Sequence, residues 1–342
     1  VMHGDRRSDN PGARVAVWIT LAVICNALTV WQASAEDRRQ YGPSSPMSPM
    51  IISEIMYHPR SITTNDGEFV ELFNTEPFGC DIGGWRLSGD IDYAFATGTV
   101  IKALSYLVVA KDTEFIRQTY GITHVMGPFS NSLPNGAGTI RLRNRQNAVM
   151  LEVEYSDNYP WPAAADGAGH TLALTKPDYG EGDVRAWSAS AMIGGNPGTN
   201  NAVLTNALSN VVINEFLAHT DPPLVDYIEL FNTATTSVNI SGCYLSDDPA
   251  TNKYRIPNGT VIGPRGFALF YQTNGFGFLM DPGGEAVYLV ASNQSYVIDA
   301  IKYPAQMNAV SSGRYPDGAP GFQMLSSRTA GSSNSAPYQS DI

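Results

Sequence analysis

The sequence predicts an all-β protein built from two consecutive immunoglobulin-like β-sandwiches. Three observations lead to this prediction: an internal repeat, many short runs of β-branched and aromatic residues between turn-forming residues, and almost no helical periodicity. The length of 342 residues exceeds that of one ordinary sandwich and suits two of them with an export segment. Hydrophobic residues make up 43% of the chain, so each half can bury a core of its own.

The internal repeat consists of blocks that occur twice in the same order. The first block, 51–58 (IISEIMYH), has a glutamate as its fourth residue and recurs at 212–219 (VINEFLAH). The remaining pairs, in chain order, are 69–75 with 227–233, 82–88 with 240–246, 98–101 with 259–262, 106–109 with 267–270, 139–142 with 286–289, and 166–167 with 317–318. Since chance does not preserve such an order, we expect the two halves to share one fold.

The blocks read as strands, because Gly, Pro, Asn or Asp bounds each of them and their spacing predicts about seven strands per module. A helical signal occurs at 112–120, where Asp112 can cap a helix of about two turns. The second module has no equivalent, so this helix is predicted to be an insertion at the edge of the first sandwich. The segment 135–138 precedes a strand and is therefore interpreted as a hairpin turn rather than a phosphate-binding loop.

The N-terminus has the order of a secretory signal peptide, predicted at 1–35. Three arginines precede an apolar run at 15–30, and the small residues Ala-Ser-Ala follow. We expect cleavage after this triplet, a spacer at 36–49, and a secreted or cell-surface protein without a transmembrane segment. The apolar run is shorter than the roughly 20 residues of a membrane span. Lipid attachment through Cys25 is disfavoured, because a bulky isoleucine precedes it.

Composition disfavours some partners and sites. The formal net charge of −11 opposes non-specific binding to nucleic acid, because the protein repels phosphate backbones. After cleavage one cysteine remains in each half, Cys80 and Cys243, so neither module can form an internal disulfide. We expect both to be small buried residues, and a bridge between the modules is the less favoured alternative. Two isolated thiols do not form a metal site.

The order of motifs resembles the lamin tail domain of bacterial secreted proteins. In both halves a first-strand glutamate is followed by Glu-Leu-Phe-Asn, by a Gly-x-x-Leu-Ser segment, and by Gly-Thr-Val-Ile before a long hydrophobic strand. The residues that carry this pattern are Glu54, Glu71, Asn74 and Trp85 in the first half and Glu215, Glu229 and Asn232 in the second, where Cys243 replaces the tryptophan. The first half also has motifs at 160–162, 165–167 and 195–198 that resemble lamin tail domains found beside CotH-type spore-coat kinase domains.

This resemblance implies an immunoglobulin-like sandwich that serves as an accessory, binding or tethering module, without catalytic residues and without a cofactor. The last three residues resemble 209–211, so they are interpreted as the start of a third repeat. The predicted organisation after the spacer is a first sandwich at 50–201, a linker at 202–210, a second sandwich at 211–335 and a tail at 336–342.

The expected function is that of a non-catalytic scaffold or binding protein outside the cell. Its modules would contact or tether a protein or a polysaccharide of the cell envelope or extracellular matrix, and two copies would raise affinity through effective concentration. Two alternatives remain. The chain could be the N-terminal accessory region of a larger exported enzyme with a CotH-like kinase or hydrolase domain, or it could be a calcium-stiffened adhesin.

The glutamate pairs Glu54/Glu71 and Glu215/Glu229 are the candidates for acid–base chemistry, because each module places two acids on neighbouring strands. A structural role is favoured. Alternation along the strand puts Glu71 on the same face as two aromatic residues, where a carboxylate persists only if it is hydrogen-bonded. We expect these side chains to accept backbone N–H groups from an adjacent turn and to fix the strand register.

Four aspartates in corresponding loops are weak candidates for calcium ligands, since Ca²⁺ prefers clustered oxygen atoms. They are Asp90, Asp92, Asp247 and Asp248. Their spacing is not that of an EF-hand, and aspartate favours turns through its local hydrogen bonds alone. No metal is therefore predicted.

The histidines do not have the spacing of metal ligands. The sequence also lacks the Gly-x-Ser-x-Gly motif that would indicate a serine nucleophile beside a catalytic histidine. His58 and His219 occupy matching positions of the repeat. His124 and His170 have no counterpart in the second module.

Three tryptophans of the first module, Trp85, Trp161 and Trp187, could line a glycan-binding face or fill the core. Because Cys243 replaces Trp85 between matching neighbours, an inward position that tolerates different sizes is predicted there. Trp161 lies between two prolines and is the predicted surface contact.

Overall fold

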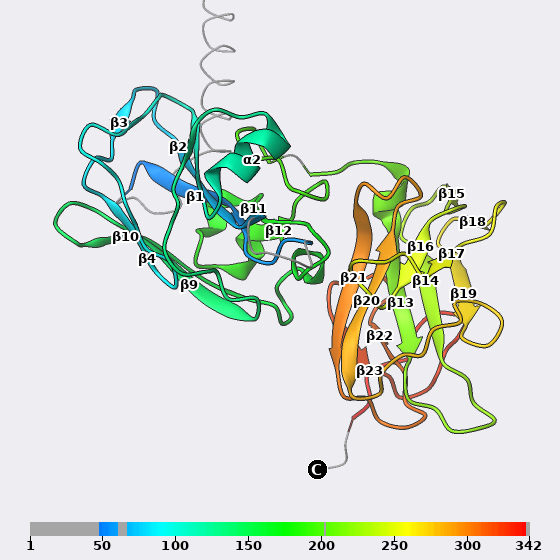
Figure 1. Ribbon diagram of the computed structural model, residues 1–342. Helices are drawn as coiled ribbons and strands as arrows, with labels where there is room; N and C mark the ends of the chain where they lie inside the picture. The colour runs from blue at the N-terminus through cyan, green and yellow to red at the C-terminus, as the bar shows by residue number, and fades with distance from the viewer. Residues whose placement is uncertain (1–47, 61–66, 202, 340–342) are drawn as a thin grey trace, which may run out of the picture. The chain divides into compact units, whose positions relative to one another are not determined.

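Residues 48–60, 67–201 and 203–339 are described by the computed structural model (Figure 1). The predicted signal peptide, nearly all of the spacer and the expected start of a third repeat at 340–342 lie outside the described residues. The described residues fold as two β-sandwiches that belong to one unit, Pro43–Ile342. Within the described ranges, no helix is long and apolar enough to cross a membrane.

The first sandwich consists of a six-stranded and a four-stranded sheet. The larger sheet has the order β12-β11-β1-β2-β7-β8, with bounds Trp187–Ala189, Leu172–Leu174, Met50–Met56, Phe69–Asn74, Tyr106–Ala110 and Val125–Met126. The smaller sheet has the order β10-β9-β4-β5, with bounds Val149–Ser156, Ala137–Arg143, Arg86–Gly89 and Tyr93–Ala94. Strands β3 (Cys80–Asp81) and β6 (Val100–Ile101) form a separate pair.

The second sandwich consists of a five-stranded and a four-stranded sheet. The larger sheet has the order β19-β14-β13-β22-β23, with bounds Phe267–Tyr271, Tyr227–Asn232, Val211–Leu217, Ser312–Arg314 and Phe322–Met324. The smaller sheet has the order β17-β16-β20-β21, with bounds Tyr254–Arg255, Tyr244–Ser246, Gly284–Val290 and Val297–Pro304. Strands β15 (Val238–Asn239) and β18 (Val261–Ile262) form a pair that corresponds to β3 and β6.

The second sandwich repeats the first nearly strand for strand, which confirms the predicted all-β fold of two immunoglobulin-like modules (Figure 1). The order β12-β11-β1-β2-β7 corresponds to β23-β22-β13-β14-β19. One difference stands out: β8 extends the sheet of the first sandwich beyond β7, whereas β19 is the last strand of its sheet.

Each sandwich closes around apolar side chains that alternate along its central strands. In β2 the inward residues are Val70 and Leu72, and both have no exposed surface. In β14 their equivalents are Ile228 and Leu230, which belong to the buried cluster of the second core. The facing strands of that cluster contribute Leu245, Val287, Leu289 and Ile301.

Helix α2 (Thr113–Tyr120) confirms the predicted insertion in the first sandwich. The Asp112 carboxylate accepts hydrogen bonds from the N–H groups of Glu114 and Phe115, both at 3.0 Å, and so caps the first turn. Gly121 ends the helix with a φ of 66°, a left-handed conformation that favours glycine. Because α2 carries the chain from β7 across to β8, these two strands run parallel, whereas the other strand pairs described above are antiparallel.

The expectation of two buried cysteines holds for Cys243, which is 1% exposed, but not for Cys80. Cys80 is half-buried because it lies on the two-residue strand β3 at the margin of the sandwich. Trp85, which Cys243 replaces, is likewise half-buried rather than enclosed. The larger indole therefore reaches the surface at a position where the thiol does not.

Candidate functional site

The two glutamates of each sandwich lie directly opposite one another on neighbouring strands. Glu54 of β1 pairs with Glu71 of β2, and Glu215 of β13 pairs with Glu229 of β14. All four side chains have no exposed surface. Because carboxylates are almost never fully buried without partners, the surroundings of each pair decide what it can do.

A β-bulge precedes the first glutamate in both copies. The register shifts between Ile52 and Glu54 in β1 and between Ile213 and Glu215 in β13. The extra residue in each strand, Ser53 or Asn214, hydrogen-bonds the second glutamate of the pair. A bulge re-aims a side chain, and here it turns a polar group toward a buried acid in both modules.

In the first sandwich a turn near the end of the module completes the partners of the pair. Glu54 Oε1 accepts hydrogen bonds from Thr171 Oγ1 at 2.5 Å and from the N–H of Asn196 at 3.1 Å. Glu71 accepts one from Ser53 Oγ at 2.7 Å and one from the N–H of Gly198. The turn is thus held to the sheet through its backbone.

The second sandwich builds the same arrangement with other side chains. Glu215 Oε1 accepts hydrogen bonds from Tyr227 Oη at 2.6 Å and from the N–H of Thr329 at 3.0 Å. Glu229 accepts them from Asn214 Nδ2 at 3.1 Å and from the N–H of Gly331 at 2.6 Å. Thr329 and Gly331 therefore take the places of Asn196 and Gly198, an equivalence that the sequence repeat does not display.

Burial favours the neutral form of these acids. It raises the pKa of Glu54 to about 7, against which the bonds from Thr171 and Asn196 act. Burial, followed by the charge of Glu54, raises the pKa of Glu71 well above its ordinary value. Burial likewise raises the pKa of Glu229 to about 7. Each buried pair thus joins its sheet to a turn later in the chain.

We predict that the stability of the protein falls between pH 5 and pH 8, and that Glu54→Gln reduces this fall by about 1–3 kcal/mol. Below pH 4.5 the Glu54 carboxyl is mostly protonated in both the folded and the unfolded chain. As the pH rises toward 7, the unfolded chain releases this proton more readily than the folded chain does, so stability is lost. Glutamine does not titrate. Urea unfolding at the two pH values, for the variant and the parent, measures the difference.

His170 titrates in the opposite direction, because burial lowers its pKa to about 4 and stability is lost as the pH falls below 6.5. Its contribution is present in both proteins and cancels from the comparison. An equal pH dependence of the variant and the parent would contradict the assignment to Glu54.

The asparagine of the Glu-Leu-Phe-Asn motif also has one structural role in both copies. Asn74 Nδ2 donates to the carbonyl groups of Phe78, Ile101 and Lys102, at 2.8, 3.1 and 2.9 Å. Asn232 Nδ2 donates to the equivalent carbonyl groups, those of Thr236, Ile262 and Gly263. One amide thus ties three backbone segments together at the end of the strand.

These two sandwiches have a common family pattern. The sequence matches the family model described as Lamin Tail Domain over residues 43–157 and 205–305. The chain belongs to the lamin tail domain family. The matched residues of the two lamin tail domains end just after β10 and β21, so the turns that bind the glutamates lie beyond them. Among curated proteins, no sequence matches the chain significantly.

The four aspartates considered for calcium already bind groups of the protein. Asp90 accepts a hydrogen bond from the N–H of Thr139 at 2.6 Å, and Asp92 pairs with Arg86, which lowers the pKa of Asp92. Asp247 pairs with a lysine at 2.5 Å, and Asp248 accepts hydrogen bonds from the loop that follows it. Among the described residues, no three His, Cys, Asp or Glu side chains gather at one point as a metal site requires.

The matched histidines differ in their partners. His58 Nδ1 lies 2.6 Å from an Asp166 oxygen, whereas His219 Nδ1 lies 2.8 Å from the carbonyl oxygen of Gln306. Of the unmatched histidines, His124 is exposed. The other, His170, donates from Nδ1 to the carbonyl of Ser190 and accepts at Nε2 from the N–H of Val297 in the second lamin tail domain, at 2.7 and 2.8 Å.

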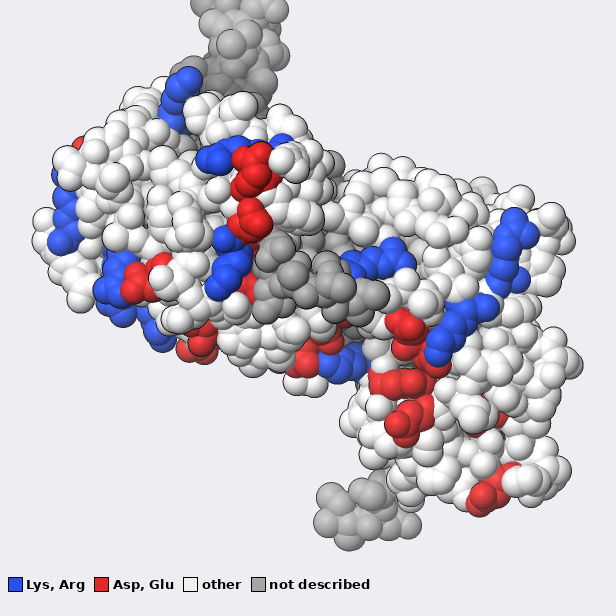
Figure 2. All heavy atoms as spheres, in the orientation of Figure 1, with Lys and Arg blue, Asp and Glu red and all other residues white. Residues whose placement is uncertain are grey.

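His170 therefore contacts the following module, which explains why it has no counterpart in the repeat. This pattern of one donor and one acceptor requires a neutral ring, and burial favours that form. On the face of the molecule that Figure 2 shows, basic side chains are scattered among acidic ones and form no continuous patch.

The aromatic residues near the predicted surface contact form a cluster in the first lamin tail domain. The ring centroids of Trp161 and Trp187 are 6.3 Å apart, with an angle of 43° between the planes. Trp187 is buried and donates from Nε1 to the carbonyl of Glu181 at 2.8 Å, whereas Trp161 is half-buried and Tyr159 is 65% exposed. All three aromatic residues line a cavity of about 720 Å³, whose remaining lining comes largely from the second lamin tail domain, including Tyr303 and Phe322.

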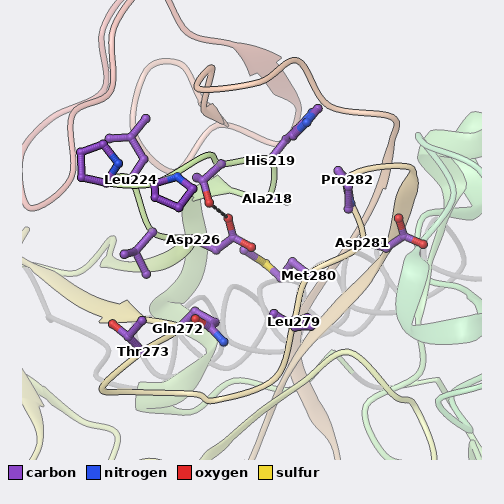
Figure 3. A pocket seen from close by; sticks show the side chains of 14 residues that line it. Ala218, His219, Leu224, Asp226, Gln272, Thr273, Leu279, Met280, Asp281 and Pro282 are labelled. Atoms are coloured by element: carbon purple, nitrogen blue, oxygen red, sulfur yellow. Dashed lines mark hydrogen bonds between the residues drawn. The ribbon is translucent and has the colours of Figure 1, made fainter.

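A second hollow, of about 710 Å³, lies in the second lamin tail domain among the loops after β13 and β19 (Figure 3). Asp226 lies near its centre and accepts a hydrogen bond from Thr220 Oγ1 at 2.7 Å. Burial raises the pKa of this carboxyl. Leu224 and Leu279 lie on opposite sides of it, and Leu279 is 76% exposed. The hollow is lined mainly by apolar and uncharged side chains, with two acids, Asp226 and Asp281.

Proposed function

We propose that this protein is a non-catalytic binding and scaffold protein that acts outside the cell, and that its first lamin tail domain binds a polysaccharide through Tyr159, Trp161 and Trp187. The aromatic cluster, in which Tyr159 is 65% exposed and Trp161 is half-buried, is the observation that carries the proposal. Aromatic rings with accessible faces contribute large apolar contact area at little loss of conformational freedom. A cavity of about 720 Å³ gives space for several sugar rings beside them.

The other residues support the non-catalytic part of the proposal. The glutamate pairs, which are the strongest candidates for acid–base chemistry, are enclosed and engaged by backbone N–H groups. The order of basic, apolar and small residues at 1–35 supports export. Lamin tail domains thus provide the frame, and the cluster, which the repeat does not share, provides the contact.

We predict that Trp161→Ala weakens binding to a cell-envelope polysaccharide by about ten-fold or more, because it removes the more accessible of the two indole rings in the cluster. A glycan array identifies the polysaccharide, and isothermal titration calorimetry then measures its affinity for the full chain. Phe78→Ala is the matched control, since Phe78 is 59% exposed and does not line the cavity. Equal weakening by both substitutions, or none by Trp161→Ala, would place the contact elsewhere. Capture of a protein instead of a glycan would favour the protein-binding alternative.

A further inference from the structure

The outer face of the larger sheet is covered in the first lamin tail domain. Helix α2 lies over it, where Ile116 packs with Phe69, Val108 and Ala110, and these four residues are at most 1% exposed. The ring of Tyr120 meets Phe69 edge-on at 6.1 Å between centroids, and its hydroxyl donates to the carbonyl of Gly194 at 2.6 Å. The helix thus covers the sheet, and its Tyr120 also contacts the segment that leads into the turn that binds the glutamates.

Among the described residues, no helix lies over the same face of the second lamin tail domain. The register of the strands identifies the equivalent residues, because Phe69 pairs with Ala110 as Tyr227 pairs with Tyr271. Tyr271 is 39% exposed where Ala110 has no exposed surface, and Leu269 is half-buried where Val108 is 1% exposed.

A hollow of about 530 Å³ occupies the place of the missing helix. Leu217, Tyr227 and Tyr271 line it from the sheet, Leu224 from the loop before β14, and Thr329 from the turn that binds the glutamates. It shares part of the 220–226 loop with the hollow of Figure 3, so the apolar surface continues from one to the other. Contiguous apolar surface bordered by polar residues marks an interaction site.

The edge of β19 is open as well. In the first lamin tail domain β8 pairs with β7 through Val108 and Val109, and the N–H of Val108 is directed to the carbonyl of His124. Leu269 is the equivalent of Val108. Within the described part of the chain, no strand pairs with the outer side of β19. An open edge offers backbone donors and acceptors to an added strand.

The charge of the residues that line the hollow indicates which kind of partner segment would bind there. Arg328 is the charged residue among those that line the hollow. Its side chain is exposed and forms no ion pair with any described residue. A segment with a carboxylate near its apolar side chains would therefore gain a charge-assisted contact on binding. Helix α2 has such a composition, with Glu114 in its first turn and Ile116 on its buried side.

We propose that the outer face and open edge of β19 form a docking surface for a partner protein. The partner supplies a short amphipathic helix with an acidic residue, followed by a strand that pairs parallel with β19. The helix covers Tyr271 and Leu269, as α2 covers their equivalents Ala110 and Val108 in the first lamin tail domain. This surface is separate from the aromatic cluster, so it operates whether or not the cluster binds a polysaccharide.

A peptide with the sequence of residues 111–127 is a direct probe, because it contains both the helix and the strand that close the first lamin tail domain. Labelled with a fluorophore and titrated with the full chain, it is expected to give saturable fluorescence polarisation. Tyr271→Glu in the protein should weaken binding at least about ten-fold, since it places a charge on the covered face. The peptide carrying Ile116→Asp should bind the unaltered protein as weakly as the unaltered peptide binds the Tyr271→Glu protein.

Leu269→Pro is a second variant that tests the edge alone. Proline is tolerated on an edge strand when its nitrogen faces outward, so the fold is retained while strand addition is blocked. Circular dichroism and thermal unfolding check that both variants are folded. Lack of saturable binding up to about 1 mM peptide, or equal binding by parent and variants, overturns the proposal. A dimer of the full chain that Tyr271→Glu dissociates, without peptide binding, would overturn it in favour of a second copy as the occupant.

Discussion

Replacement of Glu71 by alanine is expected to lower the free energy of unfolding of the first lamin tail domain by about 3–5 kcal/mol. The Glu71 side chain has no exposed surface and accepts hydrogen bonds from Ser53 Oγ and the N–H of Gly198. Alanine removes the acceptor of the Gly198 N–H, leaves the Ser53 hydroxyl with only the backbone carbonyl of residue 71 at 3.3 Å, and opens a cavity between β1 and β2. It also releases the turn at Gly198 from the sheet. Urea unfolding of the full chain measures the loss, and amide exchange at Gly198 locates it.

Glu71→Gln is the matched control for this substitution. Glutamine has nearly the same volume, and its carbonyl oxygen can still accept from the N–H of Gly198. The hydroxyl of Ser53 can turn to accept a hydrogen bond from the new amide, because a serine hydroxyl both donates and accepts. Burial already raises the pKa of Glu71, so a neutral side chain suits the site. We expect a loss of about 1 kcal/mol or less. Equal losses for alanine and glutamine would show that the two hydrogen bonds contribute little.

The sequence predicts the fold well because its signals are local or periodic. The repeat identifies equivalent strands without any contact information, and Asp112 identifies the start of α2 by its capping chemistry alone. The alternation in β2 places Glu71 among aromatic residues, from which its need for hydrogen-bond donors follows. Each inference uses only neighbours along the chain and elementary geometry.

The turn that binds the glutamates in the second lamin tail domain was not recognised in the sequence, for a physical reason. Its donors are backbone N–H groups, which every residue except proline provides. Thr329 can therefore donate to Glu215 as Asn196 donates to Glu54, although the two side chains differ. The one sequence feature that the two turns share is a glycine with positive φ, which is Gly198 with 86° in the first domain and Gly331 with 82° in the second. One glycine in a segment rich in serine is too weak a signal to align.

The open face of β19 was also beyond prediction, although the sequence shows that the second module lacks a helix. Sequence periodicity says where a helix forms but not which side chains it covers. Only the pairing of Glu229 with Leu269, and of Glu71 with Val108, establishes that Leu269 lies where α2 covers Val108. The two copies thus share strands and buried glutamates, and they differ in what lies over their sheets.

Gly195→Ala is expected to destabilise the first lamin tail domain by about 3 kcal/mol or more, far beyond the effect of a glycine substitution elsewhere. A Cβ atom at this position would overlap Glu54 Oε1 and lie 2.7 Å from Thr171 Cγ2. Glu54 cannot move aside without breaking its hydrogen bonds to Thr171 and to the N–H of Asn196. The substitution therefore strains the backbone and disrupts the glutamate network together.

Gly98→Ala separates these two effects. Gly98 has a φ of 81°, close to the 73° of Gly195, so both substitutions place alanine in a left-handed conformation at about 1 kcal/mol. No atom lies within 4 Å of a Cβ added at Gly98. The difference in unfolding free energy between the two variants thus measures the overlap of the added Cβ atom with Glu54 and Thr171. If the two variants unfolded at the same urea concentration, the network around Glu54 would have to be looser than its hydrogen bonds indicate.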